Sequence, residues 1–136
     1  MANVEWKYVS SLNEGTEVDV VELKYHYRIP DDLKDYLVNK NAGVPSPSFF
    51  DMENKKDMVF GGLLSFNTGD VDCFNDYVVL FENVDKKGLK MFPFALDPAG
   101  NFFCIKDNKV VLYNHEMDTT HYICDTFTDL LKMFHD

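Results

Sequence analysis

The sequence is poor in positive charge and above all in arginine. Its 136 residues include 13 lysines and arginines against 23 aspartates and glutamates, which gives a formal net charge of −10, and Arg28 is the one arginine. Proteins that recognise phosphate groups use arginine forks and clustered basic residues. The composition therefore argues against direct binding of nucleic acid. The negative charge could attract a basic protein partner. It could equally serve only to keep the protein soluble.

Cysteine is also scarce. Cys73, Cys104 and Cys124 are the three cysteines, and no two of them form a CxxC pair. This number and spacing exclude a framework of paired disulfides, and we expect reduced, half-buried thiols as in cytosolic proteins. A cysteine nucleophile is not favoured, because none of the three lies in a sharp glycine-flanked turn or at an evident helix start, where a thiolate would be stabilised.

Long apolar runs are missing as well. The longest run is far shorter than the roughly 20 residues that a membrane-spanning helix needs. Residues 1–20 carry four acidic side chains and lack the apolar block of a signal peptide. We therefore expect a cytoplasmic protein without a membrane segment. With 46% hydrophobic and 15% aromatic residues, the chain is too apolar for disorder, and its length predicts one domain over residues 1–136.

Four segments have the character of helices. Residues 16–28 and 30–43 each carry acidic residues in their first turn, and Pro30 separates the two segments. We expect Gly43 to end the second helix in the left-handed conformation. Residues 72–84 fit either a helix or a buried strand, and we favour the helix.

The fourth helix has the clearest pattern. Residues 126–134 place four apolar side chains at positions i, i+3, i+4 and i+7, and Asp125 is the expected N-cap. These side chains are Phe127, Leu130, Leu131 and Phe134.

Strand signals fill the rest of the chain. The expected strands cover residues 4–9, with Trp6 as an anchor, a short strand near 51, and 63–66, 91–96, 102–106, 109–113 and 121–124. Gly100 supplies a positive φ in the first hairpin loop, and Asp107-Asn108 forms a two-residue hairpin link. The pair Gly61-Gly62 should let two backbone segments approach closely. Together these elements predict an α+β fold, a mainly antiparallel twisted sheet with N-terminal helices and a C-terminal helix packed around it.

Residues with metal or catalytic chemistry do not form a convincing set. His115, Glu116 and His121 resemble part of a zinc motif, but the two histidines are six residues apart and do not stack on a helix. Asp70, Asp72 and Asp76 lack the central glycine and closing glutamate of a calcium loop. We expect no catalytic residue, no metal and no cofactor.

The ordered set of motifs resembles the SUKH superfamily, in the branch named for the yeast cell-wall-assembly regulator. Pro30 precedes a helix that ends at Asn41-Ala42-Gly43, where the family usually has a direct Asn-Gly. A Phe-Ala-x-Asp-x-x-Gly-Asn hairpin is present at 94–101, and a helix led by Phe127 closes the chain. The resemblance implies an α+β domain without catalytic residues. It also implies an immunity protein, because bacterial members mostly bind and block polymorphic toxins, often nucleases or deaminases.

If the chain is an immunity protein, as this resemblance implies, its negative charge would help it to bind a toxin. An acidic protein can be steered to the basic substrate face of a toxin that acts on nucleic acid, and can occlude it. The expected contact residues combine acidic side chains with aromatic anchors: Asp70, Asp72, Phe74, Asp76, Tyr77, Glu82 and Asp85. We expect a monomer or weak dimer. One alternative is a non-catalytic regulatory scaffold for signalling or cell-wall enzymes. Another is a small enzyme or metal protein built on His115, Glu116 and His121.

Overall fold

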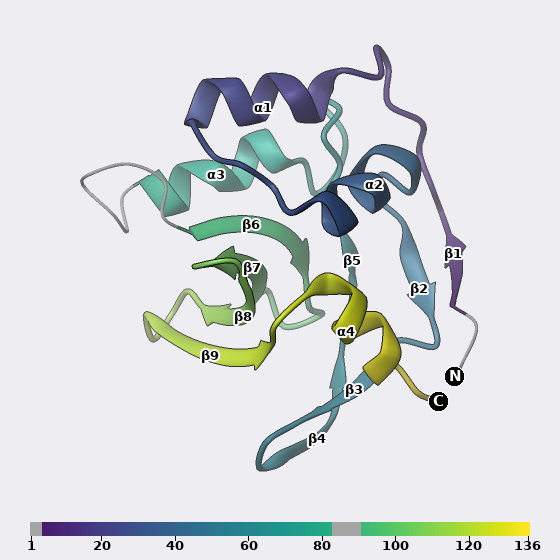
Figure 1. Cartoon of the computed structure of the whole chain (residues 1–136), viewed down its shortest axis with the longest axis vertical. Helices are drawn as coiled ribbons and strands as arrows, with labels where there is room; N and C mark the ends of the chain where they lie inside the picture. Colours follow the sequence, from purple (N-terminus) through teal and green to yellow (C-terminus); the bar gives the residue numbers. More distant parts are fainter. Residues whose placement is uncertain (1–3, 83–90) are drawn as a thin grey trace.

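A five-stranded antiparallel sheet forms the centre of the fold (Figure 1). It is seen in a computed structural model of the chain, in which residues 4–82 and 91–136 are described. In their order across the sheet, the strands are β5 (Gly62–Leu63), β6 (Met91–Leu96), β7 (Phe102–Lys106), β8 (Lys109–Asn114) and β9 (Thr119–Cys124). Every neighbouring pair is antiparallel, as the hairpin signals predict.

Helices and two smaller pairs of strands surround this sheet. β1 (Glu5–Lys7) pairs with β2 (Val44–Ser46), and β3 (Phe49–Met52) pairs with β4 (Lys55–Val59). The helices are α1 (Glu17–Tyr25), α2 (Asp31–Asn39), α3 (Phe74–Glu82) and α4 (Phe127–Met133). α3 packs against β6, and α4 contacts α2, β3 and β9. The β3–β4 hairpin projects from the body of the molecule in Figure 1. The predicted α+β fold is confirmed.

Apolar side chains cover both faces of the central strands. Five consecutive residues of β6 are buried, so the strand reads as a continuous apolar run without alternation. One face joins the main core, and the other packs with Phe81 of α3 in a second cluster. Phenylalanine dominates the main core. The ring of Phe92 stacks on Phe74 at 4.9 Å and on Tyr27 at 5.1 Å between ring centroids.

Helix α1 is shorter than the predicted segment 16–28. It ends at Tyr25, because His26 takes a left-handed conformation with φ 52° and stops the α-helical hydrogen bonding. The N–H of Tyr27 then donates back to the carbonyl oxygen of Glu22 at 3.1 Å. Histidine tolerates this conformation better than most side chains, so the stop is hard to see in a sequence.

Two predicted helix caps were wrong. The hydroxyl of Thr126, and not the carboxylate of Asp125, accepts the N–H of Asp129 at the start of α4. After α2 the positive φ of 62° belongs to Ala42, one residue before Gly43. Gly43 serves close packing instead, because a Cβ there would lie 2.8 Å from the carbonyl oxygen of Lys40.

The strands differ from their predictions at the edges of the sheet. The strand expected at 63–66 stops after Leu63, because the N–H of Ser65 donates to the carbonyl oxygen of Asp72 and the N–H of Phe66 to the side chain of Asn41. β4 was missed, since its exposed, lysine-rich start lacks apolar alternation. The favoured helix at 72–84 is confirmed as α3, which begins at Phe74 and buries both Phe74 and Phe81, while residues 83–84 lie outside the described residues.

All three cysteines are free and buried, and this leads to a prediction about their reactivity. Burial raises the pKa of Cys104, and it raises the pKa of Cys124 to about 12. At pH 8 both groups are therefore thiols and not the reactive thiolates. We expect DTNB to label the native protein roughly a hundredfold or more slower than the urea-unfolded protein, in which all three should react. Fast labelling of one thiol in the native protein would contradict this packing.

Candidate protein-binding groove

The turns that flank β5 and β6 enclose a groove of about 600 Å³. Its apolar wall includes Leu63 and Leu96 from neighbouring strands and Phe102 from β7. Asp72 and Asp97 are the charged residues among the lining, which contains no lysine, arginine or histidine within the described part of the chain. The groove is therefore apolar at its base and acidic where it carries charge. Such a surface suits a partner side chain that has both an apolar stem and a positive end.

Close backbone packing shapes the floor of the groove. The N–H of Gly61 donates to the carbonyl oxygen of Leu96 at 2.8 Å, and a Cβ on Gly61 would lie 2.7 Å from that oxygen. The N–H of Leu63 donates to the carbonyl oxygen of Gly43 at 2.9 Å. The close approach predicted for the Gly61-Gly62 pair is confirmed. Larger residues at Gly61 or Gly43 would push these segments apart and change the groove.

A buried polar network holds the loops beside the groove. The amide nitrogen of Asn41 donates to the main-chain oxygen of Ser10 at 3.1 Å and to the hydroxyl of Ser65 at 3.2 Å. Its amide oxygen accepts the N–H of Phe66 at 2.8 Å. The Ser65 hydroxyl in turn donates to the carboxylate of Asp70 at 2.7 Å. Asn41 thus ties the turn after α2 to the loop that carries the acidic residues.

This network predicts a loss of stability when Asn41 is truncated. In Asn41→Ala the buried N–H of Phe66 keeps no side-chain acceptor, and a buried donor without a partner costs about 1–3 kcal/mol. We expect the free energy of unfolding in urea to fall by that amount. Asn39→Ala is the matched control, because the side chain of Asn39 is exposed and its hydrogen bonds among the described residues go to Asp35, one turn away in α2. Equal losses in the two variants would refute the anchoring role.

Asp72 and Tyr77 form the acidic wall of the groove. The hydroxyl of Tyr77 donates to a carboxylate oxygen of Asp72 at 2.8 Å, and its ring packs edge-on against Phe102 with centroids 5.3 Å apart. This hydrogen bond and partial burial raise the pKa of Tyr77. Val71 precedes Asp72 and is 86% exposed, so an apolar side chain and a carboxylate stand together on the groove's rim.

The other residues expected to contact a partner lie in different environments. Asp76 is exposed in the first turn of α3. The carboxylate of Asp70 accepts the Ser65 hydroxyl and serves the loop's own structure. Phe74 is fully buried against Phe66, because it faces the core side of α3, so its prediction as a surface anchor is wrong. The side chain of Glu82 and all of Asp85 lie outside the described residues.

Sequence reasoning missed several parts of the groove. No sequence pattern marks Val71, Leu63 or Leu96 as residues that line a groove. The glycine pair and the Asp97–Asn101 turn that frame them are visible in the sequence. The structure does not bring His115, Glu116 and His121 together as a group that could hold a metal. Over residues 4–82 and 91–136, that description applies to Asp51, Asp57 and His135.

The fold is thus that of a small α+β domain with an acid-rimmed groove. The chain belongs to the SMI1/KNR4 family (SUKH-1), whose sequence profile matches residues 15–133. This confirms the resemblance seen in the motifs. No curated protein and no solved structure matches the chain. Among the described residues, none of the helices combines the length and apolar character needed to cross a membrane.

Proposed function

We propose that this protein is a cytoplasmic immunity protein that binds a cognate toxin and neutralises it by direct occlusion. The toxin is a basic protein of the nuclease or deaminase class, and the immunity protein contributes no catalysis. The observation that carries the proposal is the groove whose charged lining residues are all acidic, in a chain of net charge −10. Membership in the SUKH-1 family supports it, because the bacterial members that the motifs resemble are mostly immunity proteins.

Charge complementarity gives a physical basis for this recognition. An enzyme that acts on nucleic acid needs a positive substrate face, since it must contact phosphates. An acidic protein is steered toward such a face, and strongly steered pairs associate at up to about 10⁸–10⁹ M⁻¹s⁻¹ at low salt. Once bound there, the acidic protein occupies the same surface that the nucleic acid would use. Neutralisation then needs no conformational change in either protein.

The groove supplies the specific contacts in this proposal. A lysine or arginine of the toxin places its aliphatic stem over the Tyr77 ring and the apolar floor, and its charged end meets the carboxylate of Asp72. Asp76, four residues further along the chain, adds negative charge in the first turn of α3. Val71 on the rim is the exposed apolar anchor. Glu82 and Asp85 remain candidates from the sequence alone.

A pulldown tests the proposed function. Tag-bearing wild-type protein is incubated with lysate of the source organism and washed at low and at high salt. We expect one basic protein at stoichiometric level, retained more strongly at low salt. When both proteins are produced in the same cells, this protein should protect the cells from the toxicity of that partner. A partner that is not basic, or one whose activity persists in the complex, would contradict the immunity function.

The regulatory scaffold is the second candidate, favoured by the branch of the family that takes its name from a yeast cell-wall regulator. A scaffold would retain several partners, each below stoichiometric level, and would not protect cells against any of them. A toxin gene beside the gene for this protein would favour the immunity function. These outcomes separate the two functions without knowledge of the binding face.

A further inference from the structure

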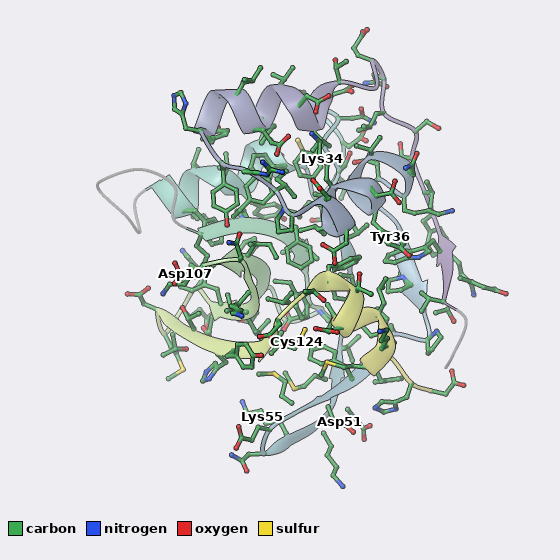
Figure 2. All side chains as sticks on the ribbon, viewed as in Figure 1. Lys34, Tyr36, Asp51, Lys55, Asp107 and Cys124 are labelled. Atoms are coloured by element: carbon green, nitrogen blue, oxygen red, sulfur yellow. The ribbon has the colours of Figure 1, made fainter. Side chains whose placement is uncertain are left out.

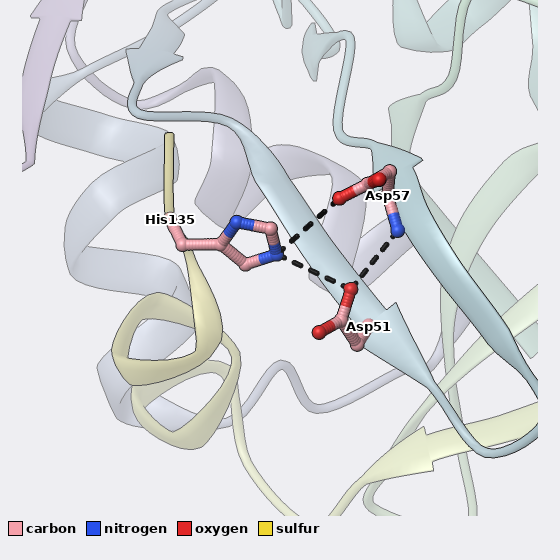
Figure 3. Close-up of side chains that lie close together, drawn as sticks. All are labelled: Asp51, Asp57 and His135. Atoms are coloured by element: carbon pink, nitrogen blue, oxygen red, sulfur yellow. Dashed lines mark hydrogen bonds and ion pairs between the residues drawn. The ribbon is translucent and has the colours of Figure 1, made fainter.

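Two carboxylates of the β3–β4 hairpin, Asp51 of β3 and Asp57 of β4, meet His135, which follows α4 at the other end of the chain (Figure 3). Their ligand atoms all lie within 4.8 Å of one another. The Nε2 atom of His135 is 3.2 Å from a carboxylate oxygen of Asp51 and 3.9 Å from one of Asp57. A ring nitrogen and two carboxylates thus face a common point.

The backbone presents these groups in fixed positions. His135 and Phe49 exchange two main-chain hydrogen bonds, of 2.7 and 3.2 Å, which pair the segment after α4 with the start of β3. The N–H of Asp57 donates to a carboxylate oxygen of Asp51 at 2.9 Å and orients that group. The imidazole also lies against the ring of Phe49, with centroids 6.3 Å apart. The cluster is therefore assembled by the fold, although its side chains are partly exposed.

The hydrogen-bond partners of His135 favour a cation beside its ring. Its Nδ1 atom lies 3.0 Å from the main-chain oxygen of Asp136, and its Nε2 atom faces Asp51. Both partners are oxygens that only accept, whereas a neutral imidazole has a single N–H to donate. When Nδ1 donates to the main chain, the lone pair of Nε2 points at two carboxylates. A positive ion at Nε2, either a proton or a metal, resolves this contact.

The distances within the cluster fit the coordination geometry of zinc. Zinc binds ring nitrogen and carboxylate oxygen at about 2.0–2.2 Å, and tetrahedral geometry then places the two ligand atoms about 3.3 Å apart. The Asp51 distance of 3.2 Å already matches, and Asp57, whose side chain is 74% exposed, needs to approach by about half an ångström. The contact from Nδ1 to a main-chain oxygen is the usual support for a metal-binding histidine.

We propose that Asp51, Asp57 and His135 bind a divalent transition-metal ion of the zinc type, with water completing the coordination. The nitrogen ligand favours such an ion over magnesium or calcium, which prefer oxygen alone. The bound ion links the β3–β4 hairpin to the segment after α4. The site is separate from the groove, so a test of metal binding does not depend on whether the toxin-binding function is correct.

Calorimetric titration of Zn²⁺ into tag-free protein tests the site. We expect one equivalent per chain, and a loss of affinity of about tenfold or more in His135→Ala and in Asp57→Asn. Asparagine suits position 57, where φ is 56°, so the second variant should keep the fold. His121→Ala is the matched control, because His121 is an exposed histidine on β9 outside the cluster.

A second measurement guards against a folding defect. Zn²⁺ should raise the melting temperature of the wild type and of His121→Ala, because a ligand that binds only the folded state stabilises it, but not that of His135→Ala. Mg²⁺ at the same concentration should leave all three unchanged. The proposal is overturned if the wild type shows no saturable Zn²⁺ binding, or if His135→Ala binds as tightly as the wild type. Loss of binding in His121→Ala alone would also overturn it.

Discussion

The double variant Asp72→Asn, Asp76→Asn is expected to bind the basic partner at least about thirtyfold more weakly than the wild type, close to 2 kcal/mol, the low end for removing a desolvated charge from an interface. Asp72 stands on the groove wall, and its carboxylate is the one that a lysine or arginine in the groove would meet. Asparagine keeps an oxygen for the Tyr77 hydroxyl and tolerates the φ of 54° at position 72. The affinity is measured by surface plasmon resonance at two salt concentrations.

The matched control removes the same charge elsewhere. Asp107→Asn, Glu53→Gln changes two exposed residues in the β7–β8 and β3–β4 turns, and position 107 has a φ of 53°, close to that of Asp72. This variant should lose little affinity and only part of the electrostatic steering. If both double variants weakened binding equally, the effect would come from net charge alone and the groove would not be the contact surface.

Phe92→Ala should cause the largest loss of stability. The Phe92 side chain is 0% exposed and stacks on Phe74 and Tyr27 at the junction of β6 with the helices. Truncation of a buried phenylalanine removes its transfer free energy and leaves a cavity, at a cost of about 3–5 kcal/mol. That cost is a large part of the total stability of a domain of this size. Urea unfolding followed by circular dichroism measures it.

Phe49→Ala provides the comparison for that variant. Phe49 is 39% exposed and its ring lies against His135 on the surface. We expect a loss of about 1 kcal/mol or less, as for other substitutions outside the core. A cost for Phe92→Ala no greater than that for Phe49→Ala would show that the aromatic core is packed differently from the structure described above.

Local sequence signals predicted the fold where they were strong. The Asp107-Asn108 link forms its hairpin, with both residues at positive φ, and Gly100 has a positive φ in the preceding turn. The apolar periodicity of 126–134 corresponds to α4. The failures occur where tertiary contacts decide. The side chain of Asn41 takes a hydrogen bond that would have extended β5, and the lysine-rich β4 forms because it pairs with β3.

The candidate site was predictable only in part. The acidic loop and Tyr77 were predicted from the sequence as contact residues, and of these Asp72 and Tyr77 line the groove. Which face of α3 points inward depends on packing, and this placed Phe74 in the core. The Asp51, Asp57 and His135 cluster joins residues up to 84 positions apart. No spacing rule for metal ligands covers such a set, so only the fold shows it (Figure 2 labels Asp51 beside the projecting hairpin).

Hydrogen exchange on the complex tests the central claim most directly. The partner recovered at low salt is bound to the protein, and backbone exchange is compared with that of the free chain. The account predicts new protection in segments 61–63, 71–77 and 97–102, which surround the groove. Protection confined to β9, the outer strand at the other side of the sheet, would contradict it and place the partner on the opposite edge.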